Sequence, residues 1–447
     1  MLDFNDTKTA FARKSDGEMR NALMLFRMMK RPGLVKAGKR ACGAAARLQL
    51  PVGWSVKPTL YRQFVGGETL EECGPTVDGL ERAGVKAALD YSAESEQTPV
   101  GIEAVFAETE RSIEYAARNK NVAYAVFKPS TLTTDTLLAK ASEHPETLTA
   151  AERTGFDAFA ARFDALCALA HRHGVRILVD AEDVRFQDAV DRLTEEAMHR
   201  YNGGRAIVFA TLQMYRCDRL PYLRRLYEDV RQADCVAGVK FVRGAYMEEE
   251  RARAAAMGYP DPICPTKEAT DANFDEGVAF AVEHIDRMEI FMGSHNETSN
   301  YRLARLMEEK GLERNDRRIF FAQLHGMGDH ISFNLAAAGY NVVKYVPYAR
   351  VRDVLPYLIR RAEENTSMAG QTTRELDVLR AEKKRRREAR RERLFGSVCA
   401  DECSVCIILF PPLNLLGRPV RRHPQFRPPT GYYITISVTP AKEVFQR

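Results

Sequence analysis

Polar side chains that are capable of chemistry follow short apolar runs repeatedly in this chain of 447 residues. For any single position, the ordinary explanation is that the end of a strand approaches solvent. The coincidence at seven of the eight runs instead favours an enzyme, because such residues bind anions, hold cofactors and transfer protons. The residues are Lys128, Asp180, Glu182, Gln213, Tyr215, Arg243, Tyr246, His295, Asn296, Gln323, His325 and Tyr345.

Two adjacent arginines stand out in the stretch 345–365, which reads YVPYARVRDVLPYLIRRAEEN. Arg360 and Arg361 follow the last apolar run, and adjacent guanidinium groups hold a carboxylate by bidentate hydrogen bonds better than lysines do. The plainer alternative is an exposed salt bridge between Arg360 and Glu364, which contributes less than about 1 kcal/mol. We therefore expect a small carboxylic acid as substrate.

The same stretch predicts a helix. Asp353 suits the N-cap position, and Pro356 then falls in the first turn, where its missing N–H has no partner to lose. An apolar stripe follows at helical spacing, formed by Leu355, Leu358, Ile359 and Ala362.

The elements that must position these residues form a regular series. Short apolar runs alternate with amphipathic helical stretches, a pattern that predicts parallel strands, and eight such repeats fit a distorted (βα)8 TIM-type barrel. In such a barrel all the polar strand ends meet at one mouth. The expected strands lie within residues 85–92, 123–130, 175–182, 206–215, 237–246, 289–296, 319–326 and 341–348.

Composition and periodicity divide the chain into four parts. We expect an N-terminal helical segment at 1–85, a barrel domain at 86–370, a basic helix at 371–393 and a non-core C-terminal extension at 394–447. The extension is rich in proline and cysteine and has no period. A zinc site at Cys399, Cys403 and Cys406 is not expected, because one C-x2-C pair is weak evidence.

Composition narrows the class of protein further. With 45% hydrophobic and 28% charged residues, the chain can bury a large core. The net charge of +5 comes from the basic block at 380–393, for which a solvated helix end is the first explanation, an anionic membrane surface the second and nucleic acid the third. No apolar run is long enough to span a bilayer, the N-terminus lacks signal and transit-peptide character, and the scattered cysteines predict reduced thiols.

Three strings resemble one known family: KFVRGAY (240–246), QLHGMGD (323–329) and the arginine stretch 345–365. They are similar to proline dehydrogenase, a flavoenzyme that oxidises L-proline to Δ1-pyrroline-5-carboxylate, the first step of proline catabolism to glutamate. The resemblance runs from about Leu2, through YRQFVGGETLEECGPTV (61–77), to the end of the basic helix. It implies FAD at the barrel mouth, with proline against the flavin face.

The resemblance also assigns roles to single residues. It implies that Arg360, Arg361 and Lys128 bind the substrate carboxylate, and that Asp180 orders the polar side. The implied walls around the substrate ring are Tyr246, Leu324, Tyr345 and Tyr357. The implied flavin contacts are Gln213, Lys240, Val242, Gly244, His295, Arg361, Glu364 and Ser367. Lys240 departs from the arginine of bifunctional bacterial members, whereas single-function members, which this chain resembles, often carry lysine there. Ala349 departs from a glycine that many members carry.

Family members use a membrane quinone as electron acceptor, which would give the basic helix a peripheral membrane role. The implied location is cytoplasmic in a bacterium and mitochondrial in a eukaryote. Three alternatives stay open at this point: a hydroxyproline dehydrogenase of the same family, a flavin-free barrel lyase or aldolase that uses Lys128 or Lys240 as a Schiff-base amine, and a basic interaction protein.

Overall fold

A computed structural model describes residues 2–47, 56–93, 97–367 and 369–400. Of these, the helical residues 41–47, 363–367, 369–371 and 394–400 are described by their backbone alone. Residues 1–386 form one compact unit and residues 387–447 a second unit, of which only the helical part is described. The expected domain boundaries at residues 85, 370 and 393 stay predictions.

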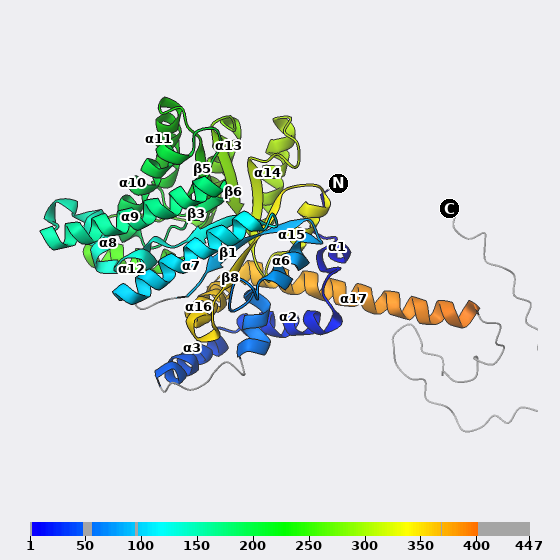
Figure 1. The fold of residues 1–447 in the computed structure, drawn as a ribbon. Helices are drawn as coiled ribbons and strands as arrows, with labels where there is room; N and C mark the ends of the chain where they lie inside the picture. Colours follow the sequence, from blue (N-terminus) through cyan, green and yellow to red (C-terminus); the bar gives the residue numbers. More distant parts are fainter. Residues whose placement is uncertain (1, 48–55, 94–96, 368, 401–447) are drawn as a thin grey trace, which may run out of the picture. The chain divides into compact units, whose positions relative to one another are not determined.

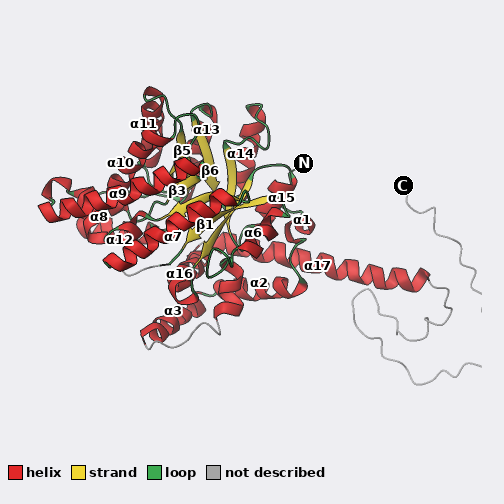
Figure 2. Ribbon diagram, viewed as in Figure 1, coloured by secondary structure: helices red, strands yellow, loops and turns green. Residues whose placement is uncertain are grey.

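The centre of the first unit is a closed barrel of eight parallel strands in sequence order, in which β1 pairs with both β2 and β8. All eight expected strands are present, so the predicted barrel is confirmed. Figures 1 and 2 show the strands surrounded by helices. The strands are β1 (Val85–Tyr91), β2 (Val122–Phe127), β3 (Arg176–Val179), β4 (Val208–Gln213), β5 (Ala237–Val242), β6 (Met288–Gly293), β7 (Ile319–Leu324) and β8 (Val342–Tyr348).

Aromatic side chains fill the interior of the barrel away from the carboxyl ends of the strands. The ring of Tyr124 meets Phe209, Phe291 and Phe320 edge to face, with centroids 5.4, 4.9 and 5.4 Å apart. Such pairs favour this geometry because the positive edge of one ring faces the negative face of another. The packed floor leaves the carboxyl ends of the strands to form a cavity, as TIM-type barrels do.

Helices of the outer ring begin and end where the sequence signals them. In α9 (Ala150–His173), Thr149 and Glu152 form a capping box, and Gly174 ends the helix at φ +65°. The other connecting helices are α7 (Pro99–Arg118), α8 (Asp135–Glu143), α10 (Val184–Tyr201), α11 (Arg219–Gln232), α12 (Met247–Met257), α13 (Lys267–Glu283), α14 (Glu297–Glu309), α15 (Asp329–Ala337) and the short 3-10 turns η2 (Pro129–Leu132) and η3 (Pro145–Thr147).

The N-terminal helices form a second apolar cluster with the two C-terminal helices. Phe26 and Phe64 pack edge to face within it, and Leu358 of α16 and Leu376 of α17 are buried there. The expectation of helices before residue 85 is confirmed for the described part. These helices are α1 (Thr7–Phe11), α2 (Asp16–Met29), α3 (Pro32–Arg47), η1 (Lys57–Tyr61), α5 (Arg62–Phe64), α6 (Gly74–Glu81), α16 (Val351–Ser367) and α17 (Ala369–Ala400).

One helix start differs from the prediction. Helix α16 begins at Val351, so Asp353 lies in its first turn and Pro356 lies inside the helix. The backbone N–H groups of Asp353 and Val354 donate to the carbonyl of Arg350, so the helix begins before the predicted cap. The apolar stripe is confirmed, because Leu355 and Leu358 are buried.

Candidate functional site

A cavity of about 240 Å³ opens at the carboxyl ends of the barrel strands. Thirteen of the fifteen residues expected at the site line it, and the other two, Glu364 and Ser367, have side chains outside the described part of the chain. The thirteen are Lys128, Asp180, Gln213, Lys240, Val242, Gly244, Tyr246, His295, Leu324, Tyr345, Tyr357, Arg360 and Arg361.

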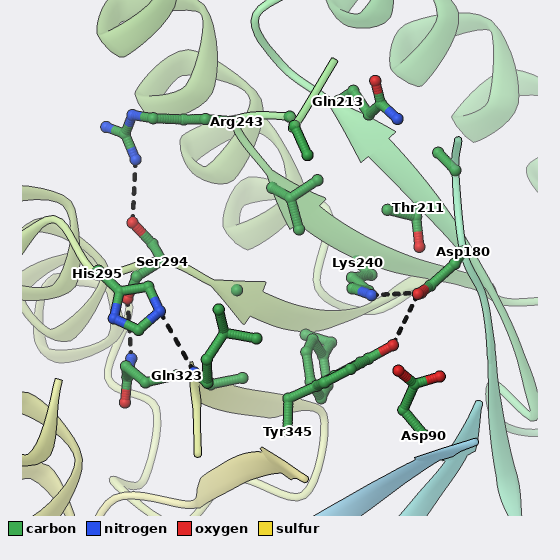
Figure 3. Close-up of a pocket in the computed structure, with 18 of the residues that line it drawn as sticks. Asp90, Asp180, Thr211, Gln213, Lys240, Arg243, Ser294, His295, Gln323 and Tyr345 are labelled. Carbon is green, nitrogen blue, oxygen red and sulfur yellow. Dashed lines mark hydrogen bonds and ion pairs between the residues drawn. The ribbon is translucent and has the colours of Figure 1, made fainter. Parts of the chain in front are cut away.

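Asp180 is the centre of the polar wall. One carboxylate oxygen accepts a hydrogen bond from Lys240 Nζ at 2.5 Å and the other accepts from the Tyr345 hydroxyl at 2.7 Å (Figure 3). Burial opposes ionisation of Asp180, but the charges of Lys240 and Lys128 outweigh burial and hold its pKa below the usual value. The carboxylate is therefore ionised and holds the Tyr345 ring in place.

Lys128 follows β2 and pairs with Asp90, with Nζ 2.5 Å from Oδ1. Burial disfavours the charged amine, yet Asp90 and Asp180 raise the pKa of Lys128 above its usual value. The sequence reasoning missed Asp90, which lies inside β1 rather than after it. Its signal was a carboxylate in the middle of an otherwise apolar strand, which needs a cation when buried.

Two arginines of α16 project cationic groups toward the same cavity. Arg360 and Arg361 are half-buried and line it, and the Arg361 guanidinium carbon lies 5.3 Å from the ring centroid of Tyr357. Burial raises the pKa of the Tyr246 hydroxyl, and the positive charges of Arg360 and Arg361 oppose that rise. The α16 arginines and Tyr246 of the β5–α12 loop therefore face one another, as a clamp for an anion requires.

His295 presents a hydrogen-bond donor without a protein acceptor. Its Nε2 accepts the Leu324 N–H at 3.3 Å, which leaves the proton on Nδ1, and Nδ1 is buried without a partner among the described residues. Burial, with Lys344 and Arg361 nearby, lowers the pKa of His295 to about 3, so the ring is neutral. A Cβ at Gly328 would stand 2.8 Å from Nδ1, so glycine there leaves room around this nitrogen.

Gly244 is a glycine for a steric reason. Its φ is +128°, and a Cβ there would lie 1.3 Å from the ring of Tyr215. Tyr215 itself is held by Gln213 and Glu250, whose side-chain oxygens each lie 2.5 Å from its hydroxyl. Burial raises the pKa of Glu250 to about 7.

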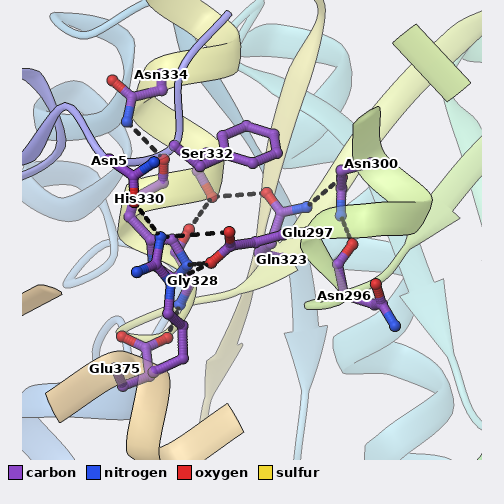
Figure 4. Close-up of polar contacts among 12 residues, drawn as sticks. Asn5, Asn296, Glu297, Asn300, Gln323, Gly328, His330, Ser332, Asn334 and Glu375 are labelled. Carbon is purple, nitrogen blue, oxygen red and sulfur yellow. Dashed lines mark hydrogen bonds and ion pairs between the residues drawn. The ribbon is translucent and has the colours of Figure 1, made fainter. Parts of the chain in front are cut away.

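Behind the cavity, α17 and α14 hold the loop that follows β7 (Figure 4). The Gly328 N–H donates to Glu375 Oε1 at 2.5 Å. Glu297 accepts from Arg374 Nε at 2.5 Å and lies 2.9 Å from His330 Nε2. Gln323 donates to the Ser294 carbonyl at 3.0 Å, which links the ends of β6 and β7. These contacts fix the loop on which Leu324 and Gly328 approach His295.

Some polar strand-end residues lie outside the cavity. His325 lines a separate hollow with Lys344, and Asn296 caps α14 by accepting from the Ser299 N–H. Tyr215 and Glu182 both contact Gln213. The Tyr215 hydroxyl donates to the Gln213 side-chain oxygen, and the Gln213 amide donates to the backbone carbonyl of Glu182. The Glu182 carboxylate accepts from the Ser130 hydroxyl. Besides Asp90, the lining residues that sequence reasoning did not single out include Thr211, Phe291, Ser294 and Met327.

The described residues offer neither a membrane-spanning helix nor a metal-binding cluster. No helix in that part of the chain is both long and apolar enough to cross a membrane. No group of three or more histidine, cysteine or acidic side chains is placed to hold a metal ion there.

Comparison with known proteins agrees with the fold. The model of the family described as proline dehydrogenase matches residues 73–374. The carbapenem antibiotics biosynthesis protein CarD of Pectobacterium carotovorum subsp. carotovorum is 36% identical over 323 residues, covering 72% of this chain and 83% of CarD. Hydroxyproline dehydrogenase of Xenopus laevis is 31% identical over 421 residues, covering 86% of this chain and 90% of that protein.

Human mitochondrial proline dehydrogenase 1 is 45% identical over 228 residues, but the match covers 50% of this chain and only 38% of the human protein. Among solved structures, proline utilization A from Bdellovibrio bacteriovorus superposes with a TM-score of 0.63 at 18% identity. That match covers 82% of this chain and 36% of the other, and it shows the shared fold.

The closed parallel barrel with a cation-lined cavity at its carboxyl end is the architecture of a TIM-barrel enzyme. The family model matches the whole barrel, and CarD and the Xenopus laevis protein match this chain over most of its length. The chain therefore belongs to the proline dehydrogenase family.

Proposed function

We propose that this chain oxidises L-proline to Δ1-pyrroline-5-carboxylate and passes the hydride to FAD. The observation that carries the proposal is the convergence of Arg360, Arg361 and Lys128 on one cavity with aromatic walls. A small zwitterionic amino acid needs cations for its carboxylate and an apolar wall for its ring, and this cavity supplies both.

In this proposal the substrate carboxylate lies between the two α16 arginines and Lys128. The guanidinium groups supply directed donors, and Lys128 stays charged because of Asp90 and Asp180. The same raised pKa argues against Lys128 as the Schiff-base amine of an aldolase, since that amine must be neutral to attack. Tyr345, held by Asp180, and Tyr357 then form walls against the ring of the substrate.

The residues present fit a flavin. His295 Nδ1 is a buried donor that needs an acceptor, and the carbonyl and ring nitrogens of a flavin are acceptors. Lys240 adds a buried cation, and the backbone of Gly244 is open to the cavity. His295, Lys240, Val242, Gly244, Gln213 and Arg361 are the described residues proposed to hold the cofactor, and Glu364 and Ser367 are proposed from the sequence.

FAD, when bound, supplies the acceptor for the hydride that leaves the carbon next to the substrate nitrogen. The chain's own residues then have only to position that carbon and exclude water. No general base is assigned, because the substrate amine need only be neutral. The charge of Asp180 is already paired with Lys240, and its other oxygen accepts from the Tyr345 hydroxyl.

We further propose a membrane quinone as the final electron acceptor. The support is the family resemblance and the basic block at 380–393, whose charge suits an anionic membrane surface. On this proposal the protein is peripheral to a membrane, at the cytoplasmic face in a bacterium or inside a mitochondrion in a eukaryote.

A second candidate substrate is 4-hydroxyproline, which the name of the Xenopus laevis relative favours. Against it stands the Tyr345 ring, only 8% exposed and fixed by its bond to Asp180, which leaves little room for an added hydroxyl. Steady-state kinetics with both amino acids and a soluble quinone analogue tests the proposal. A higher kcat/KM for L-proline is expected, and a higher value for 4-hydroxyproline would reverse the assignment.

A further inference from the structure

Two cysteines outside the cavity lie in direct contact. Cys217 follows β4 and Cys264 lies between α12 and α13, and their Sγ atoms are 3.7 Å apart. The two residues are 47 positions apart in the sequence, so the contact is made by the fold and not by the chain. Neither thiol has a role in the proposed oxidation of proline.

The backbone holds the two segments against each other. Arg216 and Ile263 form an antiparallel bridge. On either side of it, the Cys217 N–H donates to the Pro262 carbonyl at 2.9 Å and the Cys264 N–H donates to the Tyr215 carbonyl at 2.7 Å. The sulfurs are thus kept close by paired main-chain hydrogen bonds, and a disulfide requires them to approach to about 2 Å.

The two thiols differ in access to solvent. Cys217 is exposed, whereas Cys264 is 5% exposed. Burial and the neighbouring Cys217 raise the pKa of Cys264 to about 11, so it is the less reactive thiol toward a reagent in solution. An oxidant therefore reaches Cys217 first, and Cys264 is placed to react second, inside the protein.

We propose that Cys217 and Cys264 form a thiol–disulfide site that a small disulfide such as oxidised glutathione converts to an internal bridge. The Cys217 thiolate attacks one glutathione sulfur, the glutathione S–S bond breaks, and one glutathione thiol leaves. Cys264 then releases its proton and attacks Cys217 Sγ, and the second glutathione leaves. Two protein thiols are oxidised, and one oxidised glutathione is reduced to two thiols.

The disulfide would join the loop after β4 to the segment between α12 and α13. That segment is joined to α12 by Arg251, which donates to the Cys264 carbonyl at 3.1 Å. Tyr215, two residues before Cys217, is the ring against which Gly244 packs. Oxidation therefore constrains the segments that frame one side of the cavity and raises the melting temperature, because the unfolded chain loses freedom.

The full-length, flavin-loaded protein is incubated with oxidised glutathione, its remaining thiols are alkylated under denaturing conditions, and tryptic peptides are measured by mass. The expected product is peptide 217–219 joined to peptide 254–267, with reversal by dithiothreitol. The variant Cys264→Ser should instead accumulate glutathione on Cys217, since the second step is removed. The variant Cys217→Ser should give neither product.

The matched control is Cys403→Ser, which removes a thiol of the C-terminal extension and should leave the bridged peptide unchanged. The proposal is overturned if wild type keeps glutathione on Cys217 without transfer to Cys264, if Cys217 pairs with any other cysteine, or if both thiols stay reduced. These readouts require no turnover, so they do not depend on the proposed reaction with proline.

Discussion

Several charged residues of the cavity form ion pairs with one another. Asp180 is neutralised by Lys240, and Asp90 by Lys128, while the α16 arginines face the open cavity. The arginines are therefore the groups whose loss should be felt most by an anionic substrate and least by the barrel.

Replacing Arg360 with methionine tests that role. The change keeps the apolar stem and removes the charge, so KM for L-proline should rise by about ten- to a hundredfold, equivalent to roughly 1–3 kcal/mol of lost binding. Steady-state kinetics measures it. The control is Arg352→Met on the same helix, whose side chain is 74% exposed and should change little. Near-normal kinetics for the Arg360 variant would refute the carboxylate clamp.

Tyr345 is predicted to set the preference for proline over its 4-hydroxylated analogue. In Tyr345→Ser the ring is removed and the preference, measured as the ratio of kcat/KM values, should narrow several-fold. Tyr345→Phe keeps the ring while removing the bond to Asp180, so it should retain most of the discrimination. Equal ratios in wild type and the serine variant would show that the ring does not border the substrate.

Glu250 should make stability fall as pH rises. Its pKa is about 4.3 in an unfolded chain and about 7 in the fold, so the native state binds more protons between these values. Its destabilising contribution is absent below about pH 4 and complete above about pH 7. Glu250→Gln should therefore raise the melting temperature more at pH 8 than at pH 5, whereas exposed Glu249→Gln should not. An equal gain at both pH values would contradict the buried-acid assignment.

Sequence reasoning found the residues of the cavity where a polar group directly follows an apolar run or stands in a family motif. It missed Asp90 because this residue lies inside a strand, and its ion pair with Lys128 is made by the folded barrel rather than by neighbours in the sequence. The steric reason for glycine at 244 was not predictable, because the collision with Tyr215 depends on tertiary packing that spacing does not encode.

At the scale of secondary-structure elements, helix α17 holds the loop that follows β7 by a hydrogen bond. Glu375, which is 5% exposed, accepts the Gly328 N–H, and Gly328 lies against His295. This contact comes from the first part of α17, just beyond the residues that the family model matches.

Glu375→Ala should leave the Gly328 N–H without its acceptor and cost about 1–3 kcal/mol of unfolding free energy. Because Gly328 borders His295, affinity for FAD should also fall, and flavin fluorescence titration measures that. Glu375→Gln keeps an acceptor and should recover most of both losses. Asp377→Ala on the same helix, a half-exposed residue, serves as the matched control. Unchanged flavin affinity in the alanine variant would remove α17 from the support of the site.

Element boundaries were the less predictable part of the fold. The start of α16 was expected at Asp353 because aspartate and proline fit a cap, yet the backbone bonds to Arg350 begin the helix earlier. The apolar stripe of the same helix was predicted correctly, because Leu355 and Leu358 are buried.

At the scale of the whole molecule, the order of strands followed from the alternation of apolar runs with helical stretches. Parallel pairing and closure are nearly forced once eight such units occur in series. What the alternation could not predict is the cluster of N-terminal helices with α16 and α17, because that packing joins segments more than 300 residues apart.

The C-terminal extension at 394–447 should be dispensable. Its composition offers no periodic apolar face, and the family match ends at residue 374. Truncation after Arg393 should leave the melting temperature and proline-driven flavin reduction unchanged and improve solubility by removing three cysteines and an apolar run. Calorimetry and flavin absorbance measure these properties. Loss of FAD or of folding would show that the extension packs on the protein.

The most direct test of the proposed function is the visible spectrum of the purified full-length protein before and after anaerobic addition of L-proline. A protein that holds FAD and oxidises proline shows flavin absorbance that L-proline bleaches, and Arg360→Met needs a higher proline concentration for the same bleaching. A protein that shows no flavin absorbance after incubation with FAD, or a bound flavin that L-proline leaves oxidised, would contradict the proposed reaction.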